Sequence, residues 1–461
     1  MDIIDQIKCV KDTSRPIARL DDDRKNDILL SLSEELINCC DEIIEENAKD
    51  LAVMSPDNPM YDRLLLDRAR IESMAADIKN VIALPSPVGR ILEHKTMPNG
   101  LIIDKISVPL GVVAVIYESR PNVTIDVFTL CFKSGNACIL KGGKEAHHSN
   151  SVLVKIIHRV LEKYIIIDEN VVYLMPPGRE STSILLNAVG LVDVCIPRGS
   201  QSLIEFVRNN ARIPVIETGA GIVHAYFDLE GDVEKGPQII KNAKTRRVSV
   251  CNALDCLIIH KNRINDLYQL VEPLAESNVE LYADEDAYAA LEHSRPLAEP
   301  TISEDFLDQR DVGSNNEKTR VLQAPTTKIP DRGRLCERSH YPAHLLHRAT
   351  EDDFGREFLS YKMAIKTAET LDVAMEHIGK YSSGHSEAII TENEKVAWHC
   401  INRIDSAVIY INASTAFTDG AQFGMGAEIG ISTQKLHVRG PMSLDALTSY
   451  KWIVRGNGNV R

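Results

Sequence analysis

A single thiol between basic residues and an apolar run is the clearest chemical signal in the sequence. Cys251 lies in the stretch KTRRVSVCNALDCLIIH (residues 244–260), after Lys244, Arg246 and Arg247 and before the apolar run LII. The apolar run predicts a buried strand, which would leave the thiol at the edge of that strand. A cysteine near cations can hold its thiolate near neutral pH and attack an activated carbonyl. A free cysteine more often only packs as a small apolar group, so other residues must decide between these readings.

Polar residues also follow three predicted strands. From residue 111 onward, short apolar runs alternate with helical segments, which predicts a doubly wound parallel sheet. Ligands bind such sheets at the carboxyl ends of the strands. The segments at the ends of the first, second and fourth predicted strands are YESRPN (117–122), KGGK (141–144) and PRGS (197–200).

The KGGK turn is a candidate cofactor site, although it contains no G-x-G-x-x-G motif. It ends an apolar strand and opens a helix, where backbone N–H groups and the helix dipole favour a phosphate. In dinucleotide folds a carboxylate near such a strand end holds the ribose 2′-hydroxyl, whereas cations accommodate a 2′-phosphate. Lys141 and Lys144 therefore favour NADP. The alternative is an ordinary turn with solvated lysines.

Three further side chains have possible catalytic or binding roles. Glu217, 34 positions before Cys251 (251 − 217), would act as a general base or water activator, or would only cap a helix or pair with a lysine. Glu357 would accept hydrogen bonds from a sugar hydroxyl, or be a solvated helix end. Asn122 would donate its amide to a developing oxyanion, or only form a turn after Pro121.

Composition excludes several classes of protein. The 461 residues include 52 basic and 66 acidic side chains, a net charge of −14, which argues against general affinity for nucleic acid or anionic lipid. The ten cysteines form no C-x-x-C pair and no cysteine–histidine cluster at zinc spacing, so we expect neither disulfides nor a metal site. No apolar run approaches the ~18 residues of a membrane span, and the N-terminus lacks an export signal. We expect a cytoplasmic protein without membrane or nucleic-acid partners.

The chain divides into three predicted parts. Residues 1–225 hold amphipathic helices and a cofactor domain, with a hairpin at 96–108 (an Asn-Gly turn between apolar alternations) that serves oligomerisation. Residues 226–410 form an α/β catalytic domain. It is interrupted at 293–340 by a proline-broken stretch without periodicity, which we interpret as a solvated insertion. Residues 411–461 return toward the hairpin and end in YKWIVR, a strand that could pair with it.

Several long strings resemble gamma-glutamyl phosphate reductases, which belong to the aldehyde dehydrogenase superfamily. The resemblance covers about residues 1–292 and 341–461, and residues 293–340 have no counterpart in the expected pattern. The chain departs from the family's usual pattern at 220–222 and 248–249, which affects the expected shape of those loops but not the nucleophile. The strings are VPLGVVAVIYESRPNVTID, NACILKGGKEA, VCNALDCLIIH, SSGHSEAIITE and NASTAFTDGAQFGMGAEIGISTQKLHVRGPMSLDALTSYKWIVRG.

The resemblance implies a Rossmann-like cofactor domain, a catalytic domain and a small β oligomerisation domain, in a homo-oligomer. It implies NADPH-dependent reduction of L-glutamate 5-phosphate to the 5-semialdehyde in proline biosynthesis, with Cys251 as nucleophile and Asn122 at the oxyanion. The expected cofactor-binding residues are Lys141, Gly142, Lys144, Arg198, Gly199, Ser200 and Glu357. Candidates for the substrate's carboxylate and phosphate are Arg120, Arg198, Arg247 and Lys435.

Two rival functions remain open from the sequence. One is a hydrolytic NAD-dependent aldehyde dehydrogenase, in which Glu217 would activate water against the thioester. The other is a catalytically silent binding or scaffolding protein that has kept the fold. The presence of Cys251, Asn122 and Glu357 together speaks against the second rival.

Overall fold

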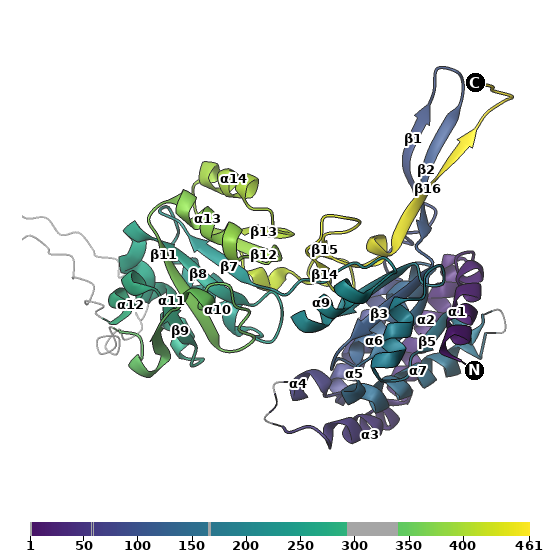
Figure 1. The fold of residues 1–461 in the computed structure, drawn as a ribbon, viewed down its shortest axis with the longest axis horizontal. Coiled ribbons are helices and arrows are strands. Elements are labelled where there is room, and N and C mark those ends of the chain that lie inside the picture. The colour runs from purple at the N-terminus through teal and green to yellow at the C-terminus, as the bar shows by residue number, and fades with distance from the viewer. Residues whose placement is uncertain (1, 57, 59, 165–166, 293–339) are drawn as a thin grey trace, which may run out of the picture.

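The structure, a computed structural model, describes the whole chain except residues 1, 57, 59, 165–166 and 293–339. It has two α/β lobes and a small β-sheet that projects from one of them (Figure 1). The predicted α/β class with parallel sheets is confirmed. The interpretation of 293–340 as an insertion falls, except for His340, outside the described residues.

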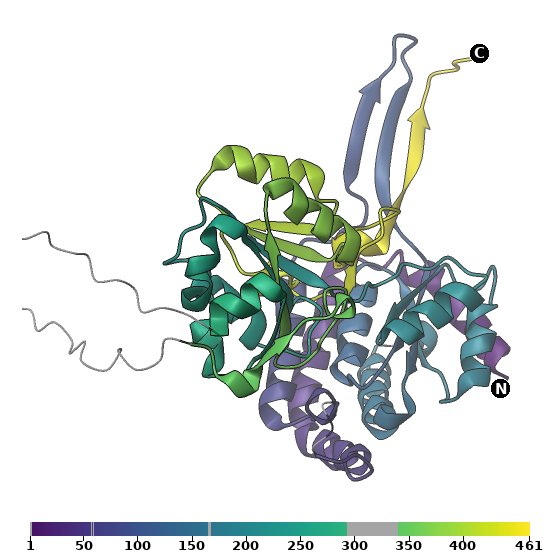
Figure 2. The same ribbon diagram turned by 60° about the vertical axis from the view of Figure 1, so that its left-hand side comes forward.

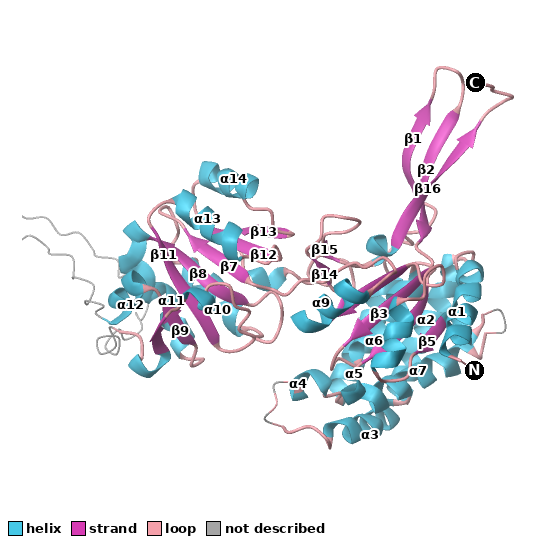
Figure 3. Cartoon of the chain, in the orientation of Figure 1, coloured by secondary structure: helices cyan, strands magenta, loops and turns pink. Residues whose placement is uncertain are grey.

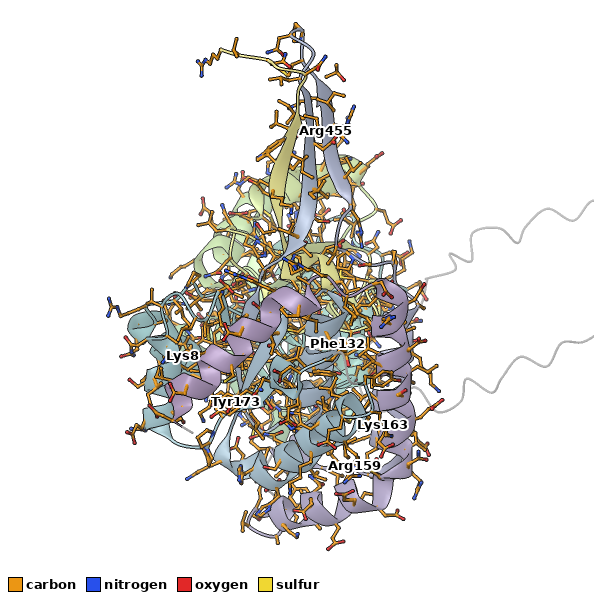
Figure 4. The ribbon with its side chains drawn as sticks, turned by 90° about the vertical axis from the view of Figure 1, so that its right-hand side faces the viewer. Lys8, Phe132, Arg159, Lys163, Tyr173 and Arg455 are labelled. Carbon is orange, nitrogen blue, oxygen red and sulfur yellow. The ribbon has the colours of Figure 1, made fainter. Side chains whose placement is uncertain are left out.

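The N-terminal helices cover one part of the first lobe. Asp2, Asp21 and Asp67 precede three of them, and each side chain accepts a hydrogen bond from a backbone N–H of the first turn, which is the usual way to begin a helix. Arg159 and Lys163, labelled in Figure 4, pair with Glu42 and Glu35 and so join two of these helices to the rest of the lobe. The helices are α1 (Ile3–Ile17), α2 (Asp22–Asn38), α3 (Cys40–Leu51), α4 (Tyr61–Leu64) and α5 (Arg68–Ile82).

A four-stranded parallel sheet forms the centre of the first lobe, in the order β5-β4-β3-β6. Every residue of β3 and β4 is buried, as expected of a parallel sheet with helices on both faces. The strands are β3 (Val112–Tyr117), β4 (Ala137–Gly142), β5 (Val172–Leu174) and β6 (Val194–Arg198). The connecting helices are α6 (Asn122–Lys133), η1 (Lys144–Ala146), α7 (His147–Leu161), η2 (Glu169–Val171), α8 (Arg179–Leu186) and α9 (Gln201–Asn210).

The short apolar run IPVIE (213–217), which the alternating pattern predicts to be a further strand, does not form one. Only an isolated bridge between Cys195 and Val215 forms there. The neighbouring Pro214 has no N–H to donate to a ladder, so pairing does not extend.

A seven-stranded parallel sheet forms the second lobe, in the order β10-β9-β11-β8-β7-β12-β13 (Figure 3). The strands are β7 (Val223–Phe227), β8 (Leu254–His260), β9 (Glu280–Ala283), β10 (Leu346–Arg348), β11 (Lys362–Ala368), β12 (Ser386–Ile390) and β13 (Val408–Ile411). The helices are α10 (Gly236–Thr245), η3 (Lys261–Asp266), α11 (Leu267–Ala275), α12 (Glu285–Glu292), η4 (Ala343–Leu345), η5 (Glu351–Asp353), α13 (Leu371–Tyr381) and α14 (Glu394–Arg403).

For this lobe, the predicted strand after Cys251 is confirmed and the predicted domain boundary is wrong. The apolar run after Cys251 is strand β8, which is buried along its whole length, as predicted. The proposed boundary between residues 225 and 226 is wrong, because it cuts β7, which pairs with β8 and β12. The lobe therefore begins before Val223.

The third sheet has the antiparallel order β1-β2-β16 and stands clear of both lobes in Figure 2. Its strands are β1 (Ile91–Thr96), β2 (Ile102–Pro109) and β16 (Thr448–Arg455), so YKWIVR pairs with the hairpin as predicted. The hairpin begins at Ile91, earlier than the predicted 96. Arg455, labelled in Figure 4, lies on this sheet and pairs with Asp104 of β2.

The segment between β13 and β16 runs back from the second lobe to the first. It contains η6 (Thr415–Phe417), β14 (Ile431–Ser432), β15 (Gly440–Pro441) and η7 (Leu444–Leu447). Within the described residues, no helix combines the length and apolar character that crossing a membrane requires.

Candidate functional site

The candidate site lies between two different sheet edges. In the second lobe its residues precede strands: Cys251 comes three residues before β8, and His385 comes directly before β12. In the first lobe they follow or end strands: Arg120 comes three residues after β3, and Arg198 ends β6. The charges of both arginines act on the Cys251 thiol, so the two edges face each other across the site.

The loop that carries Cys251 is held tightly. A Cβ added at Gly221 would overlap the carbonyl oxygen of Cys251, so only glycine fits there. Gly221 N donates to Glu357 Oε1 at 3.0 Å. The next residue, Asn252, accepts a hydrogen bond on its carbonyl from Thr415 Oγ1 at 2.8 Å. Three distant segments therefore fix the position of the thiol.

Most of the cations around the thiol are not those expected from the local sequence. Lys244 is buried, with its Nζ 3.7 Å from Asp255 Oδ1. Arg246 is exposed. The cations that lower the pKa of Cys251 are Arg120 and Arg198, both from the first lobe.

Burial nevertheless dominates the acidity of this thiol. It raises the pKa of Cys251 to about 11, and the carboxylates Glu428 and Glu357 add to that rise. Desolvation disfavours the charged form, and the two arginines offset only part of this. The expectation of a thiolate near neutral pH therefore does not hold for the ligand-free protein.

Four arginines crowd the same place. The pKa of Arg120 is lowered to about 9, first by burial and then by the positive charges of Arg198, Arg63 and Arg247. Arg198 donates to the carbonyls of Glu428 and Ile429. Like charges gathered in a partly buried place repel one another, so the cluster favours an anion between them.

The positive charges of these arginines are only partly balanced by carboxylates among the described residues. Arg63 Nη2 donates to the Ser249 carbonyl, and its buried Nε has no partner within the described part of the chain. Arg247 lies 3.6 Å from Asp62 at the surface. Among the described residues we find no hydrogen bond or ion pair for the Arg120 side chain.

Asn122 opens helix α6, and its Nδ2 donates to Asp126 Oδ2 at 2.9 Å. This bond fixes the side chain, and the amide still carries a second N–H. Asp126 is itself unusual, because burial raises its pKa to about 7 while Arg198 lowers it. The oxyanion role of Asn122 stays a prediction.

The expected cofactor lysines have few partners. Lys141 is buried and has only a long contact, 3.4 Å, with the Gly142 carbonyl; burial lowers its pKa. Lys144 is exposed in η1. The neighbouring carboxylate, Glu145, accepts from Ser119 N and Oγ at 2.8 and 2.9 Å.

Backbone N–H groups at two helix N-termini of the first lobe already donate to carboxylates. Asp50 accepts from the backbone of His148 and Ser149 at the start of α7, at 3.1 and 2.8 Å. The interpretation of the KGGK turn as a phosphate site stays a prediction, and these two N–H groups of α7 already have a carboxylate acceptor.

The same holds at α9. Glu118 accepts from Ser200 N at 2.7 Å, and a Cβ on Gly199 would approach that same carboxylate. Gly142 is likewise constrained, because a Cβ there would overlap the Asn150 amide. Ser200 and both glycines therefore shape the strand ends.

Glu217 and Lys435 are both taken by other partners. Arg208 Nε donates to Glu217 Oε1 at 2.7 Å, and Arg208 Nη2 donates to Oε2, so both carboxylate oxygens are engaged. Lys435 forms an ion pair with Asp405. Neither residue is directed at the thiol by any contact found here.

Sequence reasoning missed Arg63, His385 and Glu428. His385 is fully buried, its Nε2 has no partner among the described residues, and burial lowers its pKa to about 4. The pKa of Glu428 is raised by burial. His385 and Glu428 stand inside the strings SSGHSEAII and GAEIGIST, whereas nothing in the periodic helix around Arg63 marked it.

Comparison with known proteins gives a consistent result. No family model matches the chain. It is 52% identical over 460 residues to the gamma-glutamyl phosphate reductase of Legionella pneumophila (strain Paris), covering 100% of this chain and 99% of that protein. It is 52% identical over 461 residues to the same-named protein of Bacteroides fragilis (strain YCH46), covering 100% of both. The expectation that residues 293–340 have no counterpart in the family stays a prediction.

Solved structures agree. The crystal structure of a gamma-glutamyl phosphate reductase from Thermotoga maritima is 35% identical, covers 100% of both chains and has a TM-score of 0.85. An acetylating aldehyde dehydrogenase from Geobacillus thermoglucosidasius, 17% identical with a TM-score of 0.68 over 100% of this chain and 97% of that one, shares the fold. The chain therefore belongs to the gamma-glutamyl phosphate reductase family and has the fold of aldehyde dehydrogenases.

Proposed function

We propose that the chain reduces L-glutamate 5-phosphate to L-glutamate 5-semialdehyde and phosphate, with NADPH as reductant and a thioester on Cys251. The observation that carries this proposal is the gathering of Arg63, Arg120 and Arg198 around the thiol. An acyl phosphate with an amino-acid carboxylate is an anion at both ends, and bidentate arginines suit both groups. A neutral aldehyde substrate would give no reason for that charge.

The protein's own groups carry the first half of the reaction. The Cys251 thiolate attacks the C5 carbonyl, and the oxyanion that forms is held by the Asn122 amide and the backbone N–H of Cys251. Collapse of this intermediate breaks the bond to phosphate and leaves the thioester. The arginines stabilise the charge on the departing phosphate.

The thiol must lose its proton first, because its pKa lies well above neutrality. The carboxylates whose charge acts on Cys251 are Glu428 and Glu357, and burial raises the pKa of each. A raised pKa makes either one a stronger base than a free carboxylate, which suits it to accept that proton.

Members of this family use a nicotinamide cofactor, and the residues present fit one. Carboxylates at the strand ends are engaged by Ser119 and Ser200, whereas Lys141 and Lys144 are left without ion pairs within the described residues. We propose that these lysines hold a 2′-phosphate and that Glu357 meets the nicotinamide ribose. When bound, the cofactor supplies the hydride that reduces the thioester, and the aldehyde then leaves as the Cys251 thiolate is restored.

The cofactor preference has a direct test. We expect Lys144→Glu to lower kcat/KM with NADPH by about 10- to 100-fold and to change the value with NADH little, since each lost charged contact contributes about 1.5–3 kcal/mol. Lys155→Glu, a charge reversal on α7, is the matched control. Equal use of NADPH and NADH by the unaltered protein would contradict the assignment.

The hydrolytic rival receives less support. A water-activating carboxylate must face the thioester, but Arg208 engages both oxygens of Glu217. A silent scaffold would have no need for the tightly held Cys251 loop or for the arginines that face it.

We also propose that the β1-β2-β16 sheet joins copies of the chain. It exposes the apolar side chains of Ile91, Leu92, Trp452, Ile453 and Val454. Exposed apolar patches on a projecting sheet mark interfaces. Light scattering of a Trp452→Glu, Val454→Glu variant should show a smaller particle than the unaltered protein, and an unchanged mass would contradict the assignment.

The proposed reaction is tested by trapping the thioester. Mixing the enzyme with L-glutamate 5-phosphate in the absence of any nicotinamide should add one glutamyl group to Cys251, detectable by mass spectrometry of the peptide. Later addition of NADPH should remove the group and release semialdehyde. An adduct on another residue, or turnover without any adduct in a rapid-quench series, would contradict the mechanism.

A further inference from the structure

Three side chains that can bind a metal meet in the core of the second lobe, away from the candidate catalytic residues. His224 of β7, Cys256 of β8 and His377 of α13 each offer one ligand atom, and these atoms lie within 4.8 Å of one another. All three residues are buried. In sequence they are separated by 32 (256 − 224) and 121 (377 − 256) positions, which is why no short motif indicates them.

The fold brings them together for a simple reason. β7 and β8 are parallel neighbours, and His224 is the register partner of Cys256, so both side chains leave the sheet on the same face. Helix α13 covers that face and supplies His377. The His377 ring is held between Phe354 and Tyr381, with centroid distances of 5.3 and 4.7 Å.

A second and independent observation points to a ligand. Neither ring nitrogen of His224 has a hydrogen-bond partner within the described residues, although the side chain is fully buried. A buried polar group without a hydrogen-bond partner destabilises the folded state by about 1–3 kcal/mol. Such groups are therefore rare and often mark the place of a ligand or ion. A metal bound to the imidazole would satisfy it.

The surroundings match those of a bound divalent cation. Glu387 is fully buried, and its Oε2 lies 3.5 Å from His224 Nδ1 and accepts the His224 backbone N–H at 2.8 Å. A carboxylate beside one ring nitrogen leaves the other, Nε2, to ligate, an arrangement that recurs around protein-bound zinc.

Distance and charge also fit. Cys256 Sγ and His377 Nε2 are 3.8 Å apart. Zinc at about 2.3 Å from sulfur and about 2.0 Å from nitrogen would separate those atoms by about 3.5–3.8 Å. One Zn²⁺ with the Cys256 thiolate and the Glu387 carboxylate is neutral, which matters in a buried place.

We propose that His224, Cys256 and His377 bind one zinc ion, with Glu387 orienting His224. Binding displaces the proton of the Cys256 thiol to solvent. The ion joins α13 to β7 and β8, the strands that follow Gly221 and Cys251. Its role is therefore to stabilise the lobe behind the catalytic loop. The proposal departs from the expectation that the chain has no metal site.

The test measures zinc in the whole protein. After growth with added zinc and extensive dialysis, metal analysis should find one equivalent per chain. Cys251→Ser should keep that equivalent, which excludes the catalytic thiol as the ligand. Cys400→Ala removes another buried thiol of the same core and should also keep it. Cys256→Ala should retain less than about a tenth of an equivalent.

A second measurement does not depend on whether Cys256→Ala folds. Cobalt(II) loaded into the Cys251→Ser protein should show the absorption band of a thiolate–cobalt bond, and removing zinc with a chelator should lower Tm by about 5 °C or more. Less than about a tenth of an equivalent of zinc in the unaltered protein, full zinc in Cys256→Ala, or cobalt without a thiolate band would each overturn the proposal.

Discussion

The two parallel sheets meet the candidate site with opposite edges. The four-stranded sheet presents its carboxyl edge, where Arg120 and Arg198 follow or end strands. The seven-stranded sheet presents its amino edge, where Cys251 and His385 precede strands. The carboxyl-end rule for parallel sheets therefore describes the first lobe only.

This difference separates two tasks. The first lobe supplies positive charge, and the second supplies the nucleophile, held by Gly221 and Glu357. Neither sheet alone forms an anion site with a thiol in it. The reaction we propose depends on both edges, so changes at each should have distinguishable effects.

The largest expected effect comes from the nucleophile. Cys251→Ala should lower kcat by at least about 10⁴-fold, because loss of a covalent nucleophile removes the whole pathway. Cys195→Ala, a buried thiol in the four-stranded sheet, should leave kcat within about 3-fold, since it changes only packing. Steady-state rates of the two variants check this, and an active Cys251→Ala protein would contradict the mechanism.

The next largest effect concerns charge from the other lobe. Arg120→Gln should lower kcat/KM by about 10²-fold, in line with about 2–3 kcal/mol for a charged hydrogen bond to the substrate. Arg246 is an exposed arginine that lies close to Cys251 in sequence. Arg246→Gln should change kcat/KM by less than about 2-fold. A larger loss of kcat/KM in Arg246→Gln than in Arg120→Gln would show that the cations close in sequence act on the thiol.

The sequence predicts the strands and the nucleophile, but not the cations that act on the nucleophile. Apolar runs and helical periods predicted most strands and helices correctly, β8 among them, because burial of parallel strands demands such runs. The thiol itself was found from its position beside β8. The prediction that Lys244 lowers the pKa of the thiol was wrong. Lys244 is buried beside Asp255, and Arg120, which follows a strand of the other sheet, lowers that pKa instead. Contacts between distant segments leave no local period to detect.

A smaller effect should follow from reshaping the catalytic loop. Gly221→Ala should lower kcat by about 10-fold or more and destabilise the protein by about 1–3 kcal/mol, since the new Cβ would overlap the Cys251 carbonyl. Gly379→Ala in α13 meets nothing within 4 Å and should stabilise by about 0.5–1 kcal/mol. Thermal unfolding and rates of both variants check this. The same Tm and the same kcat in both variants would contradict the close contact between residue 221 and the Cys251 carbonyl.

The last effect concerns the acidity of the thiol and does not need a change of sequence. With the pKa of Cys251 raised to about 11, the thiolate fraction of the free enzyme rises about tenfold per pH unit between about pH 7 and 9, and alkylation by iodoacetamide should rise with it. Arg120→Gln removes a cation that favours the thiolate, so its pKa should rise further and alkylation should slow. Alkylation that levels off below about pH 8 would contradict the raised pKa.

The reverse reaction tests the central claim most directly, because the pocket that releases phosphate is also the one through which phosphate must return to cleave the thioester. The measurement is NADP reduction with glutamate 5-semialdehyde, in equilibrium with its cyclic imine, with and without inorganic phosphate, in the unaltered enzyme and in Glu217→Gln. We expect a strict requirement for phosphate that survives in Glu217→Gln, since Arg208 engages both oxygens of Glu217. Phosphate-independent NADP reduction that disappears in Glu217→Gln would show a hydrolytic dehydrogenase and contradict the account.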